Sequence, residues 1–306
     1  MRLSWQARLL TPTLRLIEKP QLARASDPVK LRASFERKAR LLFHAAKGTT
    51  QRTFDIGGYP AIEATPPNAD PDRVILYFHG GGYLFGSPRS HSAMMSALAI
   101  RSGTRVILAS YPLAPEHPFP AAPNAALKVW KTLIEQGLAS SSVVLGGDSA
   151  GGGLALSLLQ RLISEGMDKP LGTFAFAPLT DMTFSGASVQ TNAVSEAVLP
   201  ASRVNEMNAH YLGQHDPKDP NASPLFGDFE GCSPVWLCAD MTEILLDDTR
   251  RLDARLKQQN VQTVMTLTNG LPHVWPLFHN VLPEARATLD ALAHWIKRLT
   301  PQTTDS

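Results

Sequence analysis

The sequence lacks several features that would define other classes of protein. Its 306 residues contain only two cysteines, Cys232 and Cys238, which is too few for a disulfide framework, so we expect free thiols. No C-x-x-C or H-E-x-x-H spacing occurs, and we therefore predict no metal site. Neither a P-loop nor a G-x-G-x-x-G fingerprint is present, so we expect no nucleotide cofactor.

Long hydrophobic runs are also missing. No apolar stretch approaches the roughly eighteen residues that a membrane helix needs. The basic start is interrupted by Pro12 and Arg15 before the apolar core of a secretory leader could form. With 43% hydrophobic residues the chain can still bury a large core, and we expect a cytoplasmic globular protein.

The charge of the chain is unevenly distributed. Residues 1–50 hold eleven Lys and Arg against three acidic residues, which gives +8, and the remainder carries −6. Such a segment could contact a membrane or a nucleic acid. Its cations follow amphipathic helical patterns, as in residues 31–43, whose polar face water would solvate. We therefore expect no nucleic-acid partner and favour a solvated helical segment, with membrane contact through the basic N-terminus as the alternative.

From residue 73 onward, apolar strands alternate with helical patterns, which is typical of a parallel sheet buried on both faces. The predicted strands are residues 73–78, 105–111, 143–147, 173–177, 235–239 and 261–267, and the predicted helices lie near 91–102, 121–136 and 284–299. Between residues 185 and 234 the alternation stops, and Val204, Met207 and Tyr211 indicate inserted helices. This insertion could cover the carboxyl edge of the sheet, where open α/β folds bind ligands.

A G-x-S-x-G motif follows the strand at 143–147. Gly147, Ser149 and Gly151 occupy its fixed positions, and an apolar helical pattern comes directly after it. This strand-turn-helix setting is the one in which such a serine is exposed as a nucleophile, so Ser149 is the candidate.

Three successive glycines, Gly80, Gly81 and Gly82, follow His79 at the end of the strand at 73–78. Glycines let backbone N–H groups turn toward a ligand, and together with the N–H of Ala150 they could form an oxyanion hole. The alternative is an ordinary glycine-rich turn.

A serine nucleophile needs a base and an acid that orients it, in the order serine, acid, histidine for this motif. The histidines after Ser149 are His210, His215, His273, His279 and His294. We predict His273 as the base, because it lies in a Gly/Pro loop immediately after the last strand. The acid stays open at this point among four residues beyond the strand at 235–239, namely Asp240, Glu243, Asp247 and Asp248.

Four ordered motifs, His79–Gly82, Tyr111–Ala121, Gly147–Gly152 and Pro272–Val274, together resemble the bacterial hormone-sensitive-lipase-like (family IV) esterases of the α/β-hydrolase superfamily. The resemblance implies an α/β-hydrolase fold, with a mostly parallel central sheet flanked by helices and a helical cap. It places an N-terminal cap segment at residues 1–50 and a catalytic domain at 51–306 with a cap insertion at about 185–230. Similar enzymes are often homodimers and use no cofactor.

The resemblance also narrows the choice of acid. The family commonly has an aspartate in a D-x-L-x-D pattern about thirty residues before the histidine, and Glu243 occupies that first acidic position here. We therefore choose Glu243 over Asp247, since triads of this fold accept either Asp or Glu.

The function implied is a serine carboxylesterase that hydrolyses short- to medium-chain esters of small molecules through an acyl-enzyme. One alternative is an amidase or deacetylase that uses the same triad. Another is a ligand-binding protein without catalysis, since a fold alone does not fix function.

Overall fold

The computed structural model describes residues 2–25 and 27–300, and its centre is an eight-stranded sheet in the order β1-β2-β4-β3-β5-β6-β7-β8. β2 runs antiparallel to β1 and to β4, and all other neighbours are parallel. The strands are β1 (Thr50–Ile56), β2 (Tyr59–Thr65), β3 (Asp70–Phe78), β4 (Thr104–Ala109), β5 (Val143–Asp148), β6 (Gly172–Phe176), β7 (Val235–Asp240) and β8 (Thr263–Thr268). The predicted, mostly parallel α/β fold is confirmed.

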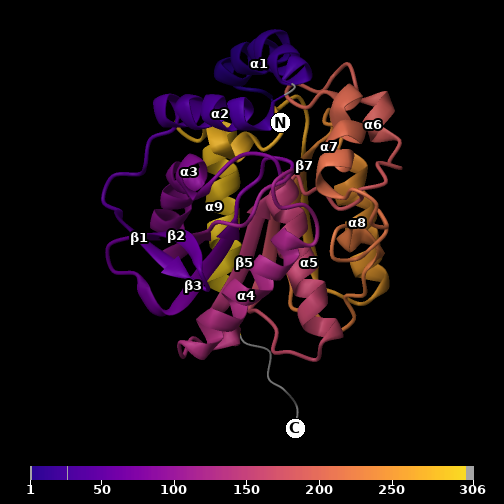
Figure 1. The fold of residues 1–306 in the computed structure, drawn as a ribbon. Helices are drawn as coiled ribbons and strands as arrows, with labels where there is room; N and C mark the ends of the chain where they lie inside the picture. Colours follow the sequence, from indigo (N-terminus) through magenta and orange to yellow (C-terminus); the bar gives the residue numbers. More distant parts are fainter. Residues whose placement is uncertain (1, 26, 301–306) are drawn as a thin grey trace.

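Helices cover both faces of this sheet and its upper edge (Figure 1). The main helices are α1 (Trp5–Arg24), α2 (Pro28–Leu42), α3 (Pro88–Ser102), α4 (Ala121–Glu135), α5 (Ser149–Ser164), α8 (Leu246–Gln258) and α9 (Pro283–Arg298). The helices α3 and α9 pack together on one face, while α4 and α5 pack on the other. α1 and α2 lie across the top of the molecule in Figure 1.

The core consists of two apolar layers because successive side chains of a strand point to opposite faces. In β3, Val74, Leu76 and Phe78 belong to the layer under α4, α5 and α8. Ile75 and Tyr77 belong to the layer under α3 and α9. Side chains on both faces of these strands are buried, which explains why the strands are continuous apolar runs in the sequence.

The hairpin of β1 and β2 was not predicted. Its first strand is polar and mostly exposed, so it carries no apolar alternation. The turn is Gly57–Gly58, and both residues have positive φ, +61° and +84°, as a tight hairpin turn requires. A Gly-Gly pair between two short runs was the signal that could have revealed it.

The segment between β6 and β7 contains short helices, as predicted. They are α6 (Ser188–Thr191), η2 (Ala201–Arg203), α7 (Val204–Tyr211) and η3 (Pro224–Phe226), with η1 (Ser140–Ser142) and η4 (Trp275–Phe278) elsewhere. The division into a cap at 1–50 and 185–230 and a catalytic domain at 51–306 stays a prediction, and its outer ends, residues 1 and 301–306, lie outside the described residues.

The thiols and the helix lengths of the described residues bear on two further points. Cys232 and Cys238 are both buried free thiols, as predicted. Among residues 2–25 and 27–300, no helix combines the length and the apolar character that crossing a bilayer would demand.

Candidate active site

Ser149 lies at a sharp turn between β5 and α5. Its φ is +51°, a left-handed conformation that is strained for a serine, and its side chain is nearly buried. A Cβ on Gly147 would lie 2.1 Å from the carbonyl oxygen of Gly151, and one on Gly151 would lie 2.2 Å from that of Phe78. The turn can therefore form only with glycine at these two positions.

The three glycines after β3 lie beside this turn. Gly81 and Gly82 have φ of +121° and +60°, conformations that favour glycine. A Cβ on Gly80 would lie 2.2 Å from Oδ2 of Asp148. The N–H of Gly80 donates to Oδ1 of Asp148 at 2.9 Å, so this loop is fastened directly to the residue before Ser149.

Asp148 is a buried carboxylate with three partners. Besides Gly80, its Oδ1 accepts from the Tyr77 hydroxyl at 2.6 Å, and its Oδ2 lies 3.4 Å from Nε2 of His91. Burial is the largest single effect and opposes charge on both groups, but their mutual attraction and their hydrogen bonds together outweigh it, so the pKa of His91 is raised and that of Asp148 is lowered. These hydrogen bonds hold the glycine loop against the serine turn. No local sequence pattern points to His91, which lies on α3.

His273 and Glu243 form a buried pair. Nδ1 of His273 lies 2.5 Å from Oε2 of Glu243, and both side chains are more than nine-tenths buried. Burial alone lowers the pKa of His273, but the hydrogen bond and the charge of Glu243 outweigh it, so this pKa is raised above its ordinary value. Nε2 of His273 is buried and has no hydrogen-bond partner among the described residues, which leaves it available to accept a proton.

The other three candidate acids accept hydrogen bonds from backbone N–H groups rather than from His273. Asp240 accepts from the backbone N–H groups of Gly270 and Leu271 and so ties the loop of Glu243 to the loop of His273. Asp247 accepts from the N–H of Ser188 at the start of α6. Asp248 is buried and accepts from the backbone at residues 180 and 181.

Two residues of the inserted segment support Glu243 and were not found from the sequence. Oε2 of the buried Glu196 accepts from the N–H of Ile244 at 3.0 Å. Nδ2 of Asn192 donates to the carbonyl oxygens of Met241 and Glu243. Nothing in the local sequence distinguishes these residues from ordinary loop residues, because their partners lie about fifty positions away in the chain.

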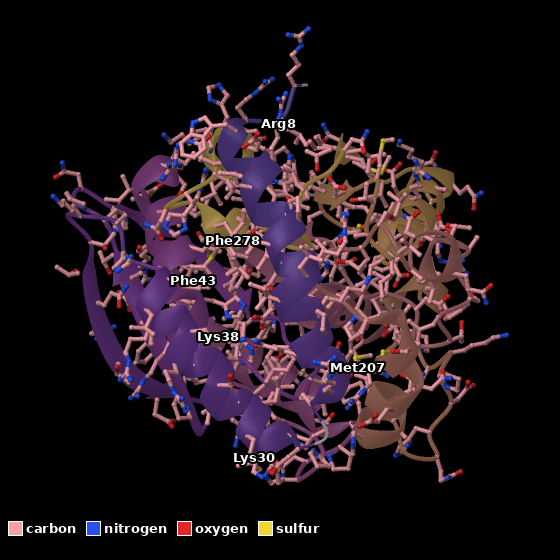
Figure 2. The ribbon with its side chains drawn as sticks, turned by 90° about the horizontal axis from the view of Figure 1, so that it is seen from above. Arg8, Lys30, Lys38, Phe43, Met207 and Phe278 are labelled. Carbon is pink, nitrogen blue, oxygen red and sulfur yellow. The ribbon has the colours of Figure 1, made fainter. Side chains whose placement is uncertain are left out.

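Ser149, His273 and the three glycines line one cavity of about 250 Å³ beneath α1 and α2. Its walls are mostly apolar side chains from the helices above it, from the loop after β3 and from the inserted segment. Examples are Leu22, Leu31, Phe35, Phe85, Leu199 and Met207. Figure 2 looks down on this region, with Lys38 between the two helices and Met207 beside them.

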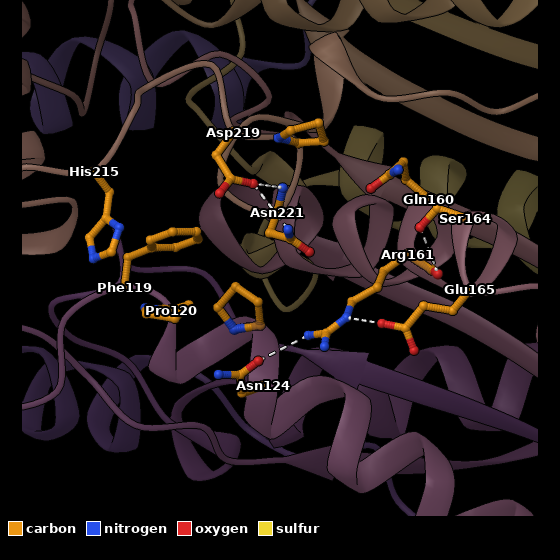
Figure 3. A pocket seen from close by; sticks show the side chains of 12 residues that line it. Phe119, Pro120, Asn124, Gln160, Arg161, Ser164, Glu165, His215, Asp219 and Asn221 are labelled. Atoms are coloured by element: carbon orange, nitrogen blue, oxygen red, sulfur yellow. Dashed lines mark hydrogen bonds and ion pairs between the residues drawn. The ribbon is translucent and has the colours of Figure 1, made fainter.

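A second, more polar pocket lies at the far end of α5 (Figure 3). It is also lined by a serine and a histidine, Ser164 and His215, but each of them contacts a different residue. The hydroxyl of Ser164 donates to the carbonyl oxygen of Arg161, and His215 packs against the ring of Phe119 at 5.1 Å between centroids. Arg161 is held by Glu165 and Asn124. This pocket therefore has no activated nucleophile.

The part of the chain that the structure describes contains no group of three or more His, Cys, Asp and Glu side chains arranged to hold a metal ion.

Comparisons with known proteins agree with this architecture. A family model described as an alpha/beta hydrolase fold matches residues 75–277. The chain belongs to the α/β-hydrolase family. This α/β hydrolase is 35% identical to an acetyl-hydrolase of Streptomyces hygroscopicus over 79% of the chain and 81% of that protein. It is 34% identical to an esterase of Acinetobacter venetianus over 78% of each.

A solved structure extends the likeness to almost the whole chain. An esterase from the bacterial hormone-sensitive lipase family superposes with a TM-score of 0.91 at 32% identity, over 98% of this chain and 99% of that one. The predicted resemblance to bacterial hormone-sensitive-lipase-like esterases is therefore confirmed.

The Asp148 cluster predicts a stability effect. Asp148→Ala should lower the free energy of unfolding by about 3–5 kcal/mol, because it leaves the Tyr77 hydroxyl, the N–H of Gly80 and Nε2 of His91 without their buried acceptor. Urea denaturation followed by circular dichroism measures this. Asp72→Ala, at an exposed aspartate, is the control and should change stability by less than about 0.5 kcal/mol. Equal effects of the two substitutions would contradict the role assigned to the cluster.

The contact between His273 and Glu243 should be visible in the pKa of the His273 imidazole. The imidazole of His273 should titrate above its ordinary pKa of 6.5 in NMR spectra recorded across pH, because the charge of Glu243 stabilises the protonated ring. In Glu243→Gln the pKa of His273 should fall, since burial opposes its charge and only the weaker attraction of Glu196 and Asp148 remains. An unchanged pKa in that variant would rule out Glu243 as the group that charges the histidine.

Proposed function

We propose that this α/β hydrolase is a serine carboxylesterase whose nucleophile is Ser149, whose base is His273 and whose acid is Glu243. The observation that carries the proposal is the meeting of a strained serine and a glutamate-paired histidine on one apolar cavity. The class of enzyme, a carboxylic ester hydrolase, is confirmed by the esterase and acetyl-hydrolase relatives.

The reaction begins with proton transfer. Nε2 of His273 removes the hydroxyl proton of Ser149 as Oγ attacks the ester carbonyl. The imidazolium that forms is stabilised by Glu243, which contacts its Nδ1. The tetrahedral intermediate collapses, the C–O bond to the alcohol breaks, and Nε2 returns the proton to the departing alkoxide. Water then repeats the sequence on the acyl-enzyme and releases the acid.

The oxyanion of the intermediate needs N–H donors that have no other partner. We assign it to the N–H groups of Gly81, Gly82 and Ala150. The N–H of Gly80 already donates to Asp148, so we assign Gly80 to positioning the loop rather than to binding the oxyanion. This narrows the predicted set of Gly80, Gly81, Gly82 and Ala150.

The cavity supports the proposed substrate class. An apolar volume of about 250 Å³ roofed by helices suits a short or medium acyl chain better than the three chains of a triglyceride. The homodimer and the cytoplasmic location stay predictions.

Activity on p-nitrophenyl esters from acetate to palmitate tests the function. Hydrolysis should peak at short or medium chains, and Ser149→Ala should reduce kcat by on the order of 10⁶-fold. Acetanilide provides the comparison with an amide. If the folded enzyme cleaves the amide and none of the esters, an amidase replaces the esterase, and activity that survives Ser149→Ala would remove Ser149 as nucleophile.

A pair of acid variants tests the choice of Glu243. Glu243→Gln should lower kcat by on the order of 10⁴-fold, because a neutral amide neither orients His273 nor stabilises its protonated ring. Asp247→Asn should leave kcat near that of the wild type, since Asp247 caps α6. Steady-state kinetics on p-nitrophenyl butyrate separates the two. A large loss in Asp247→Asn alone would reverse the assignment.

A further inference from the structure

The N-terminal segment that forms α1 and α2 exposes mostly positive charge. Seven of the eleven cations in residues 1–50 are exposed. They are Arg2, Arg8, Arg24, Lys30, Arg37, Arg40 and Lys47. The other four point inward or along the surface to fixed partners. Arg15 and Lys19 donate to carbonyl oxygens at residues 193–196, Arg32 pairs with Glu116, and Lys38 pairs with Glu18.

The three acids of this segment are all engaged in holding the helices in place. Glu18 pairs with Lys38 at 2.6 Å and so joins α1 to α2. Glu36 accepts from the hydroxyl of Ser87, and Asp27 accepts from the first backbone N–H groups of α2. The side chain of Asp27 is 43% exposed and its Oδ2 lies 3.8 Å from Nζ of Lys30, so it offsets only one of the seven exposed cations.

Large apolar side chains are exposed on the same surface. On α1, Trp5, Leu9, Leu16 and Ile17 are 69%, 63%, 76% and 54% exposed, and on α2 Leu41 is 69% exposed. The four residues of α1 follow helical spacing and lie on one side of the helix. The opposite side, with Leu14, Glu18 and Leu22, lines the catalytic cavity.

We propose that the outer face of α1 and α2 docks on an anionic lipid bilayer. Exposed leucine and tryptophan would enter the interface while arginine and lysine meet the lipid phosphates, which is the composition of interfacial helices. Figure 2 views this face from outside, with α1 and α2 side by side above the rest of the chain and Arg8 and Lys30 at its edges. Docking would place the roof of the catalytic cavity on the membrane.

The charge of this face distinguishes a bilayer from a second copy of the chain. A two-fold dimer through α1 and α2 would bring the exposed cations of each copy toward one another, and the partly exposed Asp27 already pairs with Lys30 of its own helix. An anionic bilayer matches both the positive charge and the apolar side chains. Attraction between exposed charges also weakens with salt, which makes the proposal testable by ionic strength.

Flotation of the full chain with lipid vesicles tests the proposal. The chain should float with vesicles of phosphatidylcholine and phosphatidylglycerol, and much less with phosphatidylcholine alone or at high salt. Arg8→Glu/Arg37→Glu/Arg40→Glu should weaken partitioning by at least about a hundredfold, because each basic residue near the surface contributes severalfold. Leu9→Ser/Leu16→Ser should weaken it through lost apolar contact.

The matched control changes the net charge equally at the opposite end of the molecule. Lys131→Glu/Lys297→Glu/Arg298→Glu substitutes exposed cations of α4 and α9 and should partition like the wild type. All three variants should hydrolyse p-nitrophenyl butyrate at the rate of the wild type, which shows that they fold. Ser149→Ala should also bind vesicles normally. Failure of the proposed esterase function and failure of the proposed membrane docking can therefore be told apart.

Three results would overturn the proposal. The first is that the wild type does not float with anionic vesicles. The second is that the control variant loses as much binding as the variant of α1 and α2. The third is that sedimentation velocity shows a dimer that Leu9→Ser/Leu16→Ser dissociates, while vesicles bind neither protein, which would assign the face to a second copy of the chain.

Discussion

The close approach of two backbones at the carboxyl edge of the sheet is the constraint on which the site depends. The carbonyl oxygens of Phe78 and His79 lie where a side chain on Gly151 would begin, so the end of β3 and the start of α5 are in direct contact. Asp148 then bridges the same gap by accepting from Gly80. A nucleophile turn and a glycine loop from distant parts of the chain thereby become one rigid unit, and rigidity is what preorganised donors require.

The second half of the site is assembled by carboxylates that take no part in the chemistry proposed here. Asp240 at the end of β7 collects N–H groups from the loop that carries His273. Glu196 holds the backbone immediately after Glu243. Each buried carboxylate is satisfied by backbone donors, so the two loops are positioned by hydrogen bonds rather than by packing alone. This explains how a histidine and a glutamate in loops after two different strands can meet at 2.5 Å.

The features that depend on a short run of neighbouring residues could be predicted from the sequence. Those that depend on contacts between residues far apart in the chain could not. Ser149 and the glycines at 80–82 stand out because strained turns need particular residues at fixed spacing. The apolar strands were found because both faces of the sheet are buried. The pairing of Asp148 with His91 and the hydrogen bond between Glu196 and the backbone beside Glu243 were not predicted. Each joins residues far apart in the sequence, and no local pattern marks either contact. The polar strand β1 was missed because its exposed residues follow no apolar pattern.

Hydrogen bonds link helix α1, at the surface of the molecule, to the backbone beside Glu243 by way of one residue, Glu196. Arg15 and Lys19 of α1 donate to carbonyl oxygens at Ala193, Ser195 and Glu196. Burial lowers the pKa of Lys19, and the charge of Glu196 opposes that effect. Glu196 in turn binds the N–H next to Glu243. A helix that roofs the cavity is therefore also an anchor for the loop that orients His273, so the position of α1 and the geometry of the site are set by one continuous hydrogen-bond network.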